Sequence, residues 1–150
     1  MGEISHMRSI IVMLIIIPIL GACGTSSSTT QIVQPVHTAQ DVVDKLKAIG
    51  LTINDNLPRT EGEKSLDALY KDQNSFEIVD SGTKYAGAVT ICQKKSDCDG
   101  LYDNLQISVK LGLVQVWRSE DGFIICMIDS KLSKHISEQI QSIIETLKLT

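Results

Sequence analysis

Eleven consecutive apolar residues near the N-terminus constrain the fold of this chain more than any other feature. The run extends from Ile10 to Leu20 in a sequence of 150 residues. As a helix, residues 10–23 would rise about 21 Å, which is short of the roughly 30 Å hydrocarbon core of a bilayer. This length is typical of the apolar region of a signal peptide. We therefore expect residues 1–22 to be removed and residues 38–150 to form one folded domain.

The end of the apolar run, Leu20-Gly21-Ala22-Cys23, resembles the lipobox of bacterial lipoproteins. Small residues let the backbone enter the cleft of a protease in the membrane plane, and a thiol is a good nucleophile for thioether formation. The resemblance implies that Cys23 carries diacylglycerol and that the signal peptide is cut between Ala22 and Cys23. Two acyl chains anchor stably, whereas one binds a membrane only marginally.

The lipobox resemblance implies a place on the extracytoplasmic face of a cell membrane, with membrane lipid as a partner through acylated Cys23. Two other interpretations remain open: an ordinary secretory peptide beside which Cys23 is incidental, and an uncleaved anchor. The Ser/Thr-rich stretch after Cys23 has little to bury, which favours a disordered tether over residues 24–37. As a random coil this tether would span roughly 20 Å.

Three segments of the remaining chain carry the pattern of amphipathic helices. The first begins with Thr38 and Asp41 at capping-box spacing and stops at Gly50. The second begins with a similar pattern at Ser96 and continues as an apolar stripe to Val109, although alternating apolar residues over 105–111 also fit a strand. The third is marked by apolar residues at helical spacing from Ile136 to Leu147 and is predicted to be capped by Ser133.

Two hairpins are predicted between these helices. Residues 76–80 and 85–92 flank a turn at Ser81-Gly82, and residues 113–119 and 123–129 flank Asp121-Gly122. One face of the strand 85–92 carries only small side chains, which lets another element pack closely against it. The order α-β-β-α-β-β-α predicts a two-layer α+β domain with a four-stranded antiparallel sheet packed against helices.

The charge of the chain argues against nucleic-acid binding. The sequence has 14 Lys and Arg against 18 Asp and Glu, a net charge of −4, and loss of residues 1–22 removes one acid and one base. The basic residues form no stripe of the kind that nucleic-acid partners require. We therefore expect no nucleic-acid partner.

Three cysteines remain beyond Cys23, in a chain expected outside the cytoplasm. Cys92 and Cys98 lie at a predicted strand end and helix start, where a tight connection would permit a disulfide. The alternative is that both are small buried apolar residues. Their five intervening residues differ from the two of redox motifs, so catalysis is not expected. Cys126, in an apolar strand, is predicted to be a buried free thiol.

The sequence predicts no catalytic residue, no metal site and no cofactor. None of the histidines His6, His37 and His135 stands near a cysteine, so zinc lacks a ligand set. The acids around Gly100 do not have calcium-loop spacing, and motifs for phosphate, dinucleotide or nucleophilic chemistry are missing.

The preferred hypothesis is therefore a non-catalytic, membrane-anchored binding or accessory protein of the cell envelope, whose partner is an envelope protein or a small ligand. One alternative is a thiol-dependent envelope redox protein that uses Cys92 and Cys98. The other alternative is a passive structural or assembly component.

Overall fold

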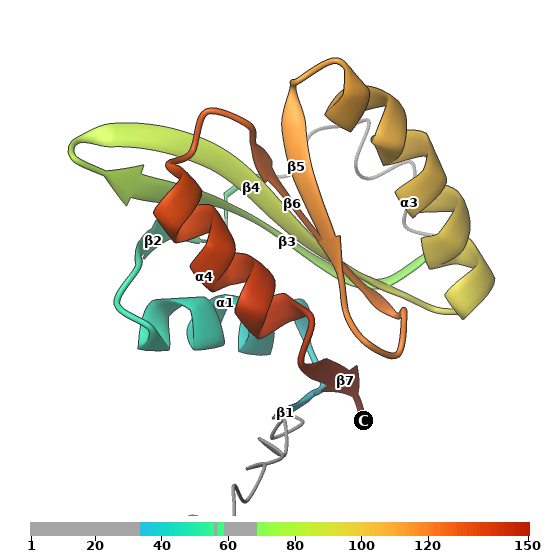
Figure 1. Ribbon diagram of the computed structural model, residues 1–150. Helices are drawn as coiled ribbons and strands as arrows, with labels where there is room; N and C mark the ends of the chain where they lie inside the picture. The colour runs from blue at the N-terminus through green and yellow to red at the C-terminus, as the bar shows by residue number, and fades with distance from the viewer. Residues whose placement is uncertain (1–33, 56, 59–68) are drawn as a thin grey trace, which may run out of the picture. The chain divides into compact units, whose positions relative to one another are not determined.

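A computed structural model describes residues 34–55, 57–58 and 69–150 of the chain, which contain an antiparallel sheet with helices on both faces (Figure 1). The helices are α1 (Ala39–Ala48), α3 (Lys95–Lys110) and α4 (Lys134–Ile144). The main sheet has the order β2-β3-β4-β6-β5, with the bounds Thr52–Asn54, Tyr70–Asp80, Thr83–Cys92, Ile124–Asp129 and Val114–Arg118. A separate parallel pair joins β1 (Gln34–Val36) to β7 (Leu147–Leu149).

The two predicted hairpins form the centre of the sheet. β3 and β4 pair in antiparallel register through a turn at Ser81 and Gly82, both of which have positive φ. Such angles suit a two-residue turn that follows the twist of the strands, and glycine adopts them without steric cost. β5 and β6 pair in the same way around Gly122, with φ 81°. β6 lies between β4 and β5, and both of its faces carry buried side chains.

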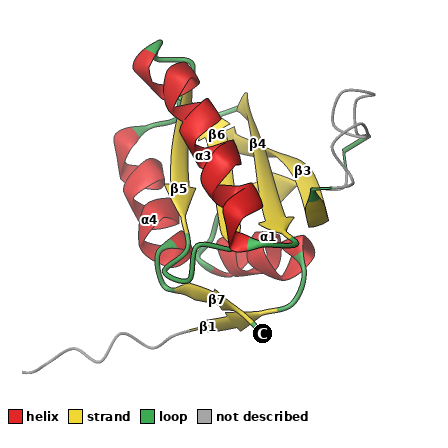
Figure 2. Cartoon of the chain, turned by 90° about the vertical axis from the view of Figure 1, so that its right-hand side faces the viewer, coloured by secondary structure: helices red, strands yellow, loops and turns green. Residues whose placement is uncertain are grey.

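The two faces of the sheet are covered unequally. We call the face under α1 and α4 the two-helix face; it holds the main core, including Phe76, Ile78, Val89, Ile124 and Ile128. We call the face under α3 the one-helix face; it holds a smaller cluster around Cys92, Cys98 and Ile125. Figure 2 looks onto α3 as it crosses this second face.

The fold class α+β with an antiparallel sheet is confirmed, but the predicted two layers and four strands are wrong. The sheet has a fifth strand, β2, and helices lie on both of its faces. β2 is only three residues long and pairs with the far end of β3, so no apolar periodicity marks it. β3 also begins at Tyr70, well before the predicted strand at 76–80.

The predicted tether and the ordered part of the chain overlap. Gln34–Val36, placed by the sequence in a tether over 24–37, form β1, and Val36 is fully buried. The pairing partner is β7, more than 100 residues further along the chain. A three-residue pairing between distant segments has no local pattern in the sequence. The strand β1 was therefore not predicted.

Helix starts follow the predicted caps only in part. Thr38 and Asp41 form the predicted capping box, with the Asp41 N–H donating to Thr38 Oγ1 at 3.1 Å. The prediction at Ser96 is wrong, because the cap of α3 is Lys94, two residues earlier, and its side chain makes no capping hydrogen bond. Ser133 occupies the cap position of α4, but its side chain makes no capping hydrogen bond.

Candidate functional site

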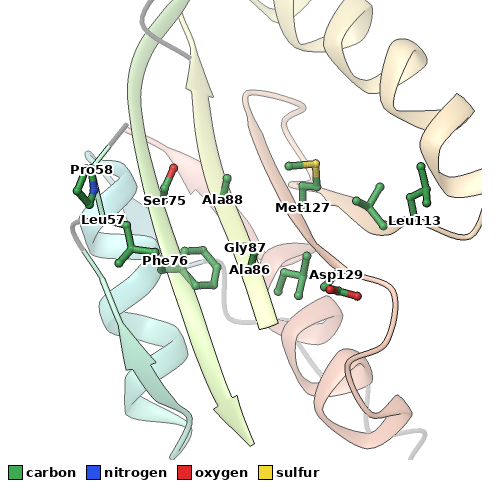
Figure 3. A pocket seen from close by; sticks show the side chains of 12 residues that line it. Leu57, Pro58, Ser75, Phe76, Ala86, Gly87, Ala88, Leu113, Met127 and Asp129 are labelled. Atoms are coloured by element: carbon green, nitrogen blue, oxygen red, sulfur yellow. The ribbon is translucent and has the colours of Figure 1, made fainter. Parts of the chain in front are cut away.

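An apolar groove lies on the one-helix face, where α3 leaves part of the sheet uncovered. Its floor is one row of the antiparallel register, in which Ser75 of β3 stands beside Ala88 of β4, and Ala88 beside Met127 of β6. Figure 3 shows these side chains pointing to the same side of the sheet. Because Ser75 and Ala88 are small, the floor is low and leaves a cavity of about 370 Å³.

Apolar residues form walls at the two ends of the groove. Leu57 and Pro58 stand at one end, beyond β3, and Leu113 and Val114 stand at the other, where α3 gives way to β5 (Figure 3). The Leu57 N–H donates to the Ser75 carbonyl at 3.2 Å, which fixes the first wall against the sheet. Leu113 is 59% exposed, so apolar surface continues from the groove onto the outside of the molecule.

A second, smaller cavity of about 190 Å³ continues the groove beneath α3. The two cavities share Ala88 and Met127, and Leu101 and Leu105 of α3 form the roof of the second one. Its lining includes Gln73, whose Oε1 is buried and makes no hydrogen bond to any residue that the structure describes. A buried acceptor left without a donor costs about 1–3 kcal/mol, so this oxygen would gain from a donor in the cavity.

The helix over this cavity, α3, buries fewer of its side chains than α1 and α4 do. Cys98 is the one fully buried side chain recorded for α3, whereas α1 and α4 bury several each. Ile107 and Leu111, near its C-terminal end, are 62% and 69% exposed. The apolar stripe predicted for this helix is therefore only partly covered by the sheet.

Cys92 and Cys98 are joined in a disulfide that ties the end of β4 to the first turn of α3. Their Cα atoms are 5.6 Å apart, and both residues are fully buried. A redox-active cysteine needs an accessible thiolate in an electropositive setting. This pair instead lies among Ile125 and the apolar residues of α3, a setting typical of a structural crosslink.

Cys126 lies on the two-helix face and is fully buried. Burial disfavours the thiolate and raises the pKa of Cys126 to about 12. The thiol therefore stays protonated at physiological pH and acts as a small apolar side chain in the core.

The groove lining includes one carboxylate, that of Asp129, whereas the charged pairs described next lie at the surface. Lys47 lies 2.6 Å from Asp55, and hydrogen bonds from Lys47 and Gln40 lower the pKa of that carboxyl. Lys84 lies 2.9 Å from Glu77 and lowers the pKa of Glu77 in the same way. These carboxylates are fixed in their ionised forms, which suits salt bridges and not proton transfer.

The other residues considered from the sequence do not assemble into a site. His37 Nδ1 lies 2.9 Å from the carbonyl oxygen of Thr150 at the chain end. His135 lies in the first turn of α4, and Asp99 pairs with Arg118 at 2.6 Å. No group of three or more metal-ligating side chains occurs within the described ranges. The lipobox, Leu20 to Cys23, lies outside those ranges.

Within the part of the chain that the structure describes, no helix is long and apolar enough to cross a membrane. Comparison with protein families, with curated proteins and with solved structures finds no match for this chain. Arguments about function therefore rest on the geometry of the chain itself.

Sequence reasoning found the floor of the groove in part and missed its walls. The small side chains of the strand 85–92 predicted a face open to close packing, and Ala86 and Ala88 do line the groove. The sequence did not predict that the groove walls include Leu57, Pro58 and Leu113. Their place in the groove depends on how the loops at the two sides of four paired strands are arranged. The buried oxygen Oε1 of Gln73 was also missed. An alternation of apolar and polar residues does not show which polar side chains another element covers.

Proposed function

We propose that the chain is a lipid-anchored, extracytoplasmic binding protein whose groove takes a small apolar ligand carrying a hydrogen-bond donor. The observation that carries this proposal is the groove itself, a mostly apolar cavity of about 370 Å³ next to a buried acceptor, Gln73 Oε1, that has no partner among the described residues. Binding sites for small molecules are typically cavities of roughly 300–1,000 Å³ with apolar linings and few polar groups. The donor would meet Gln73 Oε1 beneath α3.

The position of β1 supports the same function. Val36 of β1 packs into the core of the two-helix face, whereas the groove lies on the one-helix face. A chain anchored through acylated Cys23 would thus join the domain at a strand that packs on the two-helix face. This arrangement keeps the groove accessible when the domain is held near a membrane.

The alternative of a thiol-dependent redox protein has less support. Both sulfurs of the Cys92–Cys98 pair are buried, so an external thiol has no path to them without movement of α3. A passive structural role would leave the groove without a purpose.

A neutral fluorescent probe with one N–H donor, N-phenyl-1-naphthylamine, tests the binding function directly. We expect saturable fluorescence enhancement with the wild-type protein and at least a tenfold loss of affinity, about 1.4 kcal/mol, in Ala86→Phe. Ala86 is exposed and lines the groove, so a phenyl ring there fills the cavity without entering the core.

The matched control is Ala48→Phe, the same change at an exposed position at the end of α1. It should bind the probe like the wild type. Binding that is absent from the wild type, or that survives Ala86→Phe unchanged, would overturn the proposed function.

A further inference from the structure

The edge of the sheet at β5 pairs with no other strand among the described residues. β5 is the last strand in the order β2-β3-β4-β6-β5, and β6 is its one described neighbour. Figure 1 shows α4 to one side of β5 and α3 to the other. The backbone of β5 therefore has one edge that pairs with no strand that the structure describes.

The register fixes which backbone groups point outward. The Ser119 N–H donates to the Ile124 carbonyl at 3.0 Å, and the Ser130 N–H donates to the Leu113 carbonyl at 3.2 Å. Because hydrogen-bonded and non-hydrogen-bonded pairs alternate in an antiparallel ladder, the N–H and C=O groups of every second residue between them face away from β6. These residues are Val114, Val116 and Arg118, whose backbone groups bond to no described residue.

The β5 edge lacks the devices that usually protect such a strand. Proteins cover exposed edges with proline, lysine, bulges or very short strands. β5 has five residues, Val-Gln-Val-Trp-Arg, with a continuous register against β6. Its one charged side chain, Arg118, is held against Asp99 at 2.6 Å and lies over the ring of Tyr102.

We propose that β5 pairs antiparallel with β5 of a second copy of this chain, giving a twofold dimer with a continuous ten-stranded sheet. With the twofold axis at Val116, the outward backbone N–H and C=O groups of Val114 pair with those of Arg118 in the second copy. The backbone groups of Val116 pair with those of Val116 in the second copy. This register forms about six backbone hydrogen bonds and places no two arginines opposite each other. A closed twofold contact of this kind uses the same edge on both copies.

The position of the β1–β7 pair agrees with this dimer. A twofold axis through antiparallel edge strands runs perpendicular to the sheet, so both two-helix faces lie on the same side. Val36 and Leu147, the buried residues of the β1–β7 pair, belong to that side. Both copies of β1, to which the tethers connect, therefore lie on one side of the dimer, and both grooves lie on the other; this part of the inference rests on the proposed anchor.

Cysteine crosslinking of the full chain in its own host tests the register. In a hydrogen-bonded pair the Cα atoms lie about 5.5 Å apart, within the range that a disulfide spans. Val116→Cys should crosslink to its own copy under mild oxidation. Arg118→Cys alone should not, because its copies would lie about 13 Å apart along the strands, but it should crosslink when co-expressed with Val114→Cys.

Two further variants separate the dimer from chance encounters and from misfolding. Lys134→Cys, whose side chain is 89% exposed, measures random collision. Val116→Pro removes an N–H that points outward, which an edge strand tolerates, and should abolish the dimer in sedimentation while the protein stays folded by circular dichroism. Crosslinking of Val116→Cys no greater than that of Lys134→Cys, or a dimer that survives Val116→Pro, would overturn the proposal.

The crosslink is read in whichever cell fraction contains the protein, and it does not depend on ligand binding. A dimer in the soluble exported fraction would contradict the anchor and leave the pairing of β5 intact. A monomer in the membrane fraction would contradict the pairing of β5 and leave the anchor intact.

Discussion

Gly87 is the position at which the centre of the sheet excludes a side chain. A Cβ there would lie 2.6 Å from the ring of Phe76 and 3.3 Å from Cγ1 of Ile128. The ring of Phe76 thus fills the space above the glycine on the two-helix face. We predict that Gly87→Ala lowers the free energy of unfolding by about 1–3 kcal/mol, the usual range for an overpacked core, measured by urea denaturation.

Gly100 is the matched control for this substitution. It lies within α3, and a Cβ there would meet no atom within 4 Å. Gly100→Ala should raise the free energy of unfolding by about 0.5–1 kcal/mol, because alanine is the better helix former. Equal effects of the two substitutions would contradict the packing of Phe76 over Gly87.

Cys126 is predicted to be inert toward thiol reagents in the native state. With its pKa raised to about 12 from 9.0 by burial, its thiol should react at pH 8 only after unfolding in guanidinium. In the unfolded chain the thiol has the ordinary pKa of 9.0, so as the pH rises the unfolded state loses this proton before the folded state does. The contribution of Cys126 to the free energy of unfolding is therefore complete below pH 9 and is lost between pH 9 and 12. Fast labelling of the folded protein, or an identical alkaline profile in Cys126→Ala, would contradict this account.

At the level of single elements, α3 depends most on its crosslink. Because Cys98 is its one recorded fully buried side chain, the Cys92–Cys98 disulfide replaces much of the packing that holds α1 and α4. On the chain-entropy estimate, Cys92→Ala/Cys98→Ala should lose about 2 kcal/mol of stability. Hydrogen exchange should show the amides of α3 losing protection while those of α4 keep it; equal protection of both helices would be evidence against this role.

The sequence predicted the elements that carry their own local signals. The capping box at Thr38, the turn at Ser81-Gly82 and the loop at Gly122 all depend on neighbouring residues, and the structure has all three. The apolar alternation over 105–111 proved to be the end of a helix and not a strand. β1, β2 and β7 were missed because each is three residues long and forms only by pairing with a distant segment.

At the level of the whole molecule, helices cover the two faces of the sheet unequally, and the candidate site follows from that inequality. Two helices cover one face, while α3 covers only part of the other and leaves the groove beside it. The small residues Ala86 and Ala88 could be read from the sequence as a face for close packing. The number of helices that reach this face could not, because it depends on the side of the sheet to which each connection crosses.

The most direct test of a tethered binding protein is the intact mass and N-terminal peptide of the chain recovered from the membrane fraction of its host. The account predicts a chain that begins at Cys23 and carries the added mass of diacylglycerol. The domain would then be held within the reach of an 11-residue segment, residues 23–33, that leads to β1. An unmodified chain in the soluble exported fraction, or one that retains residues 1–22, would contradict the anchor.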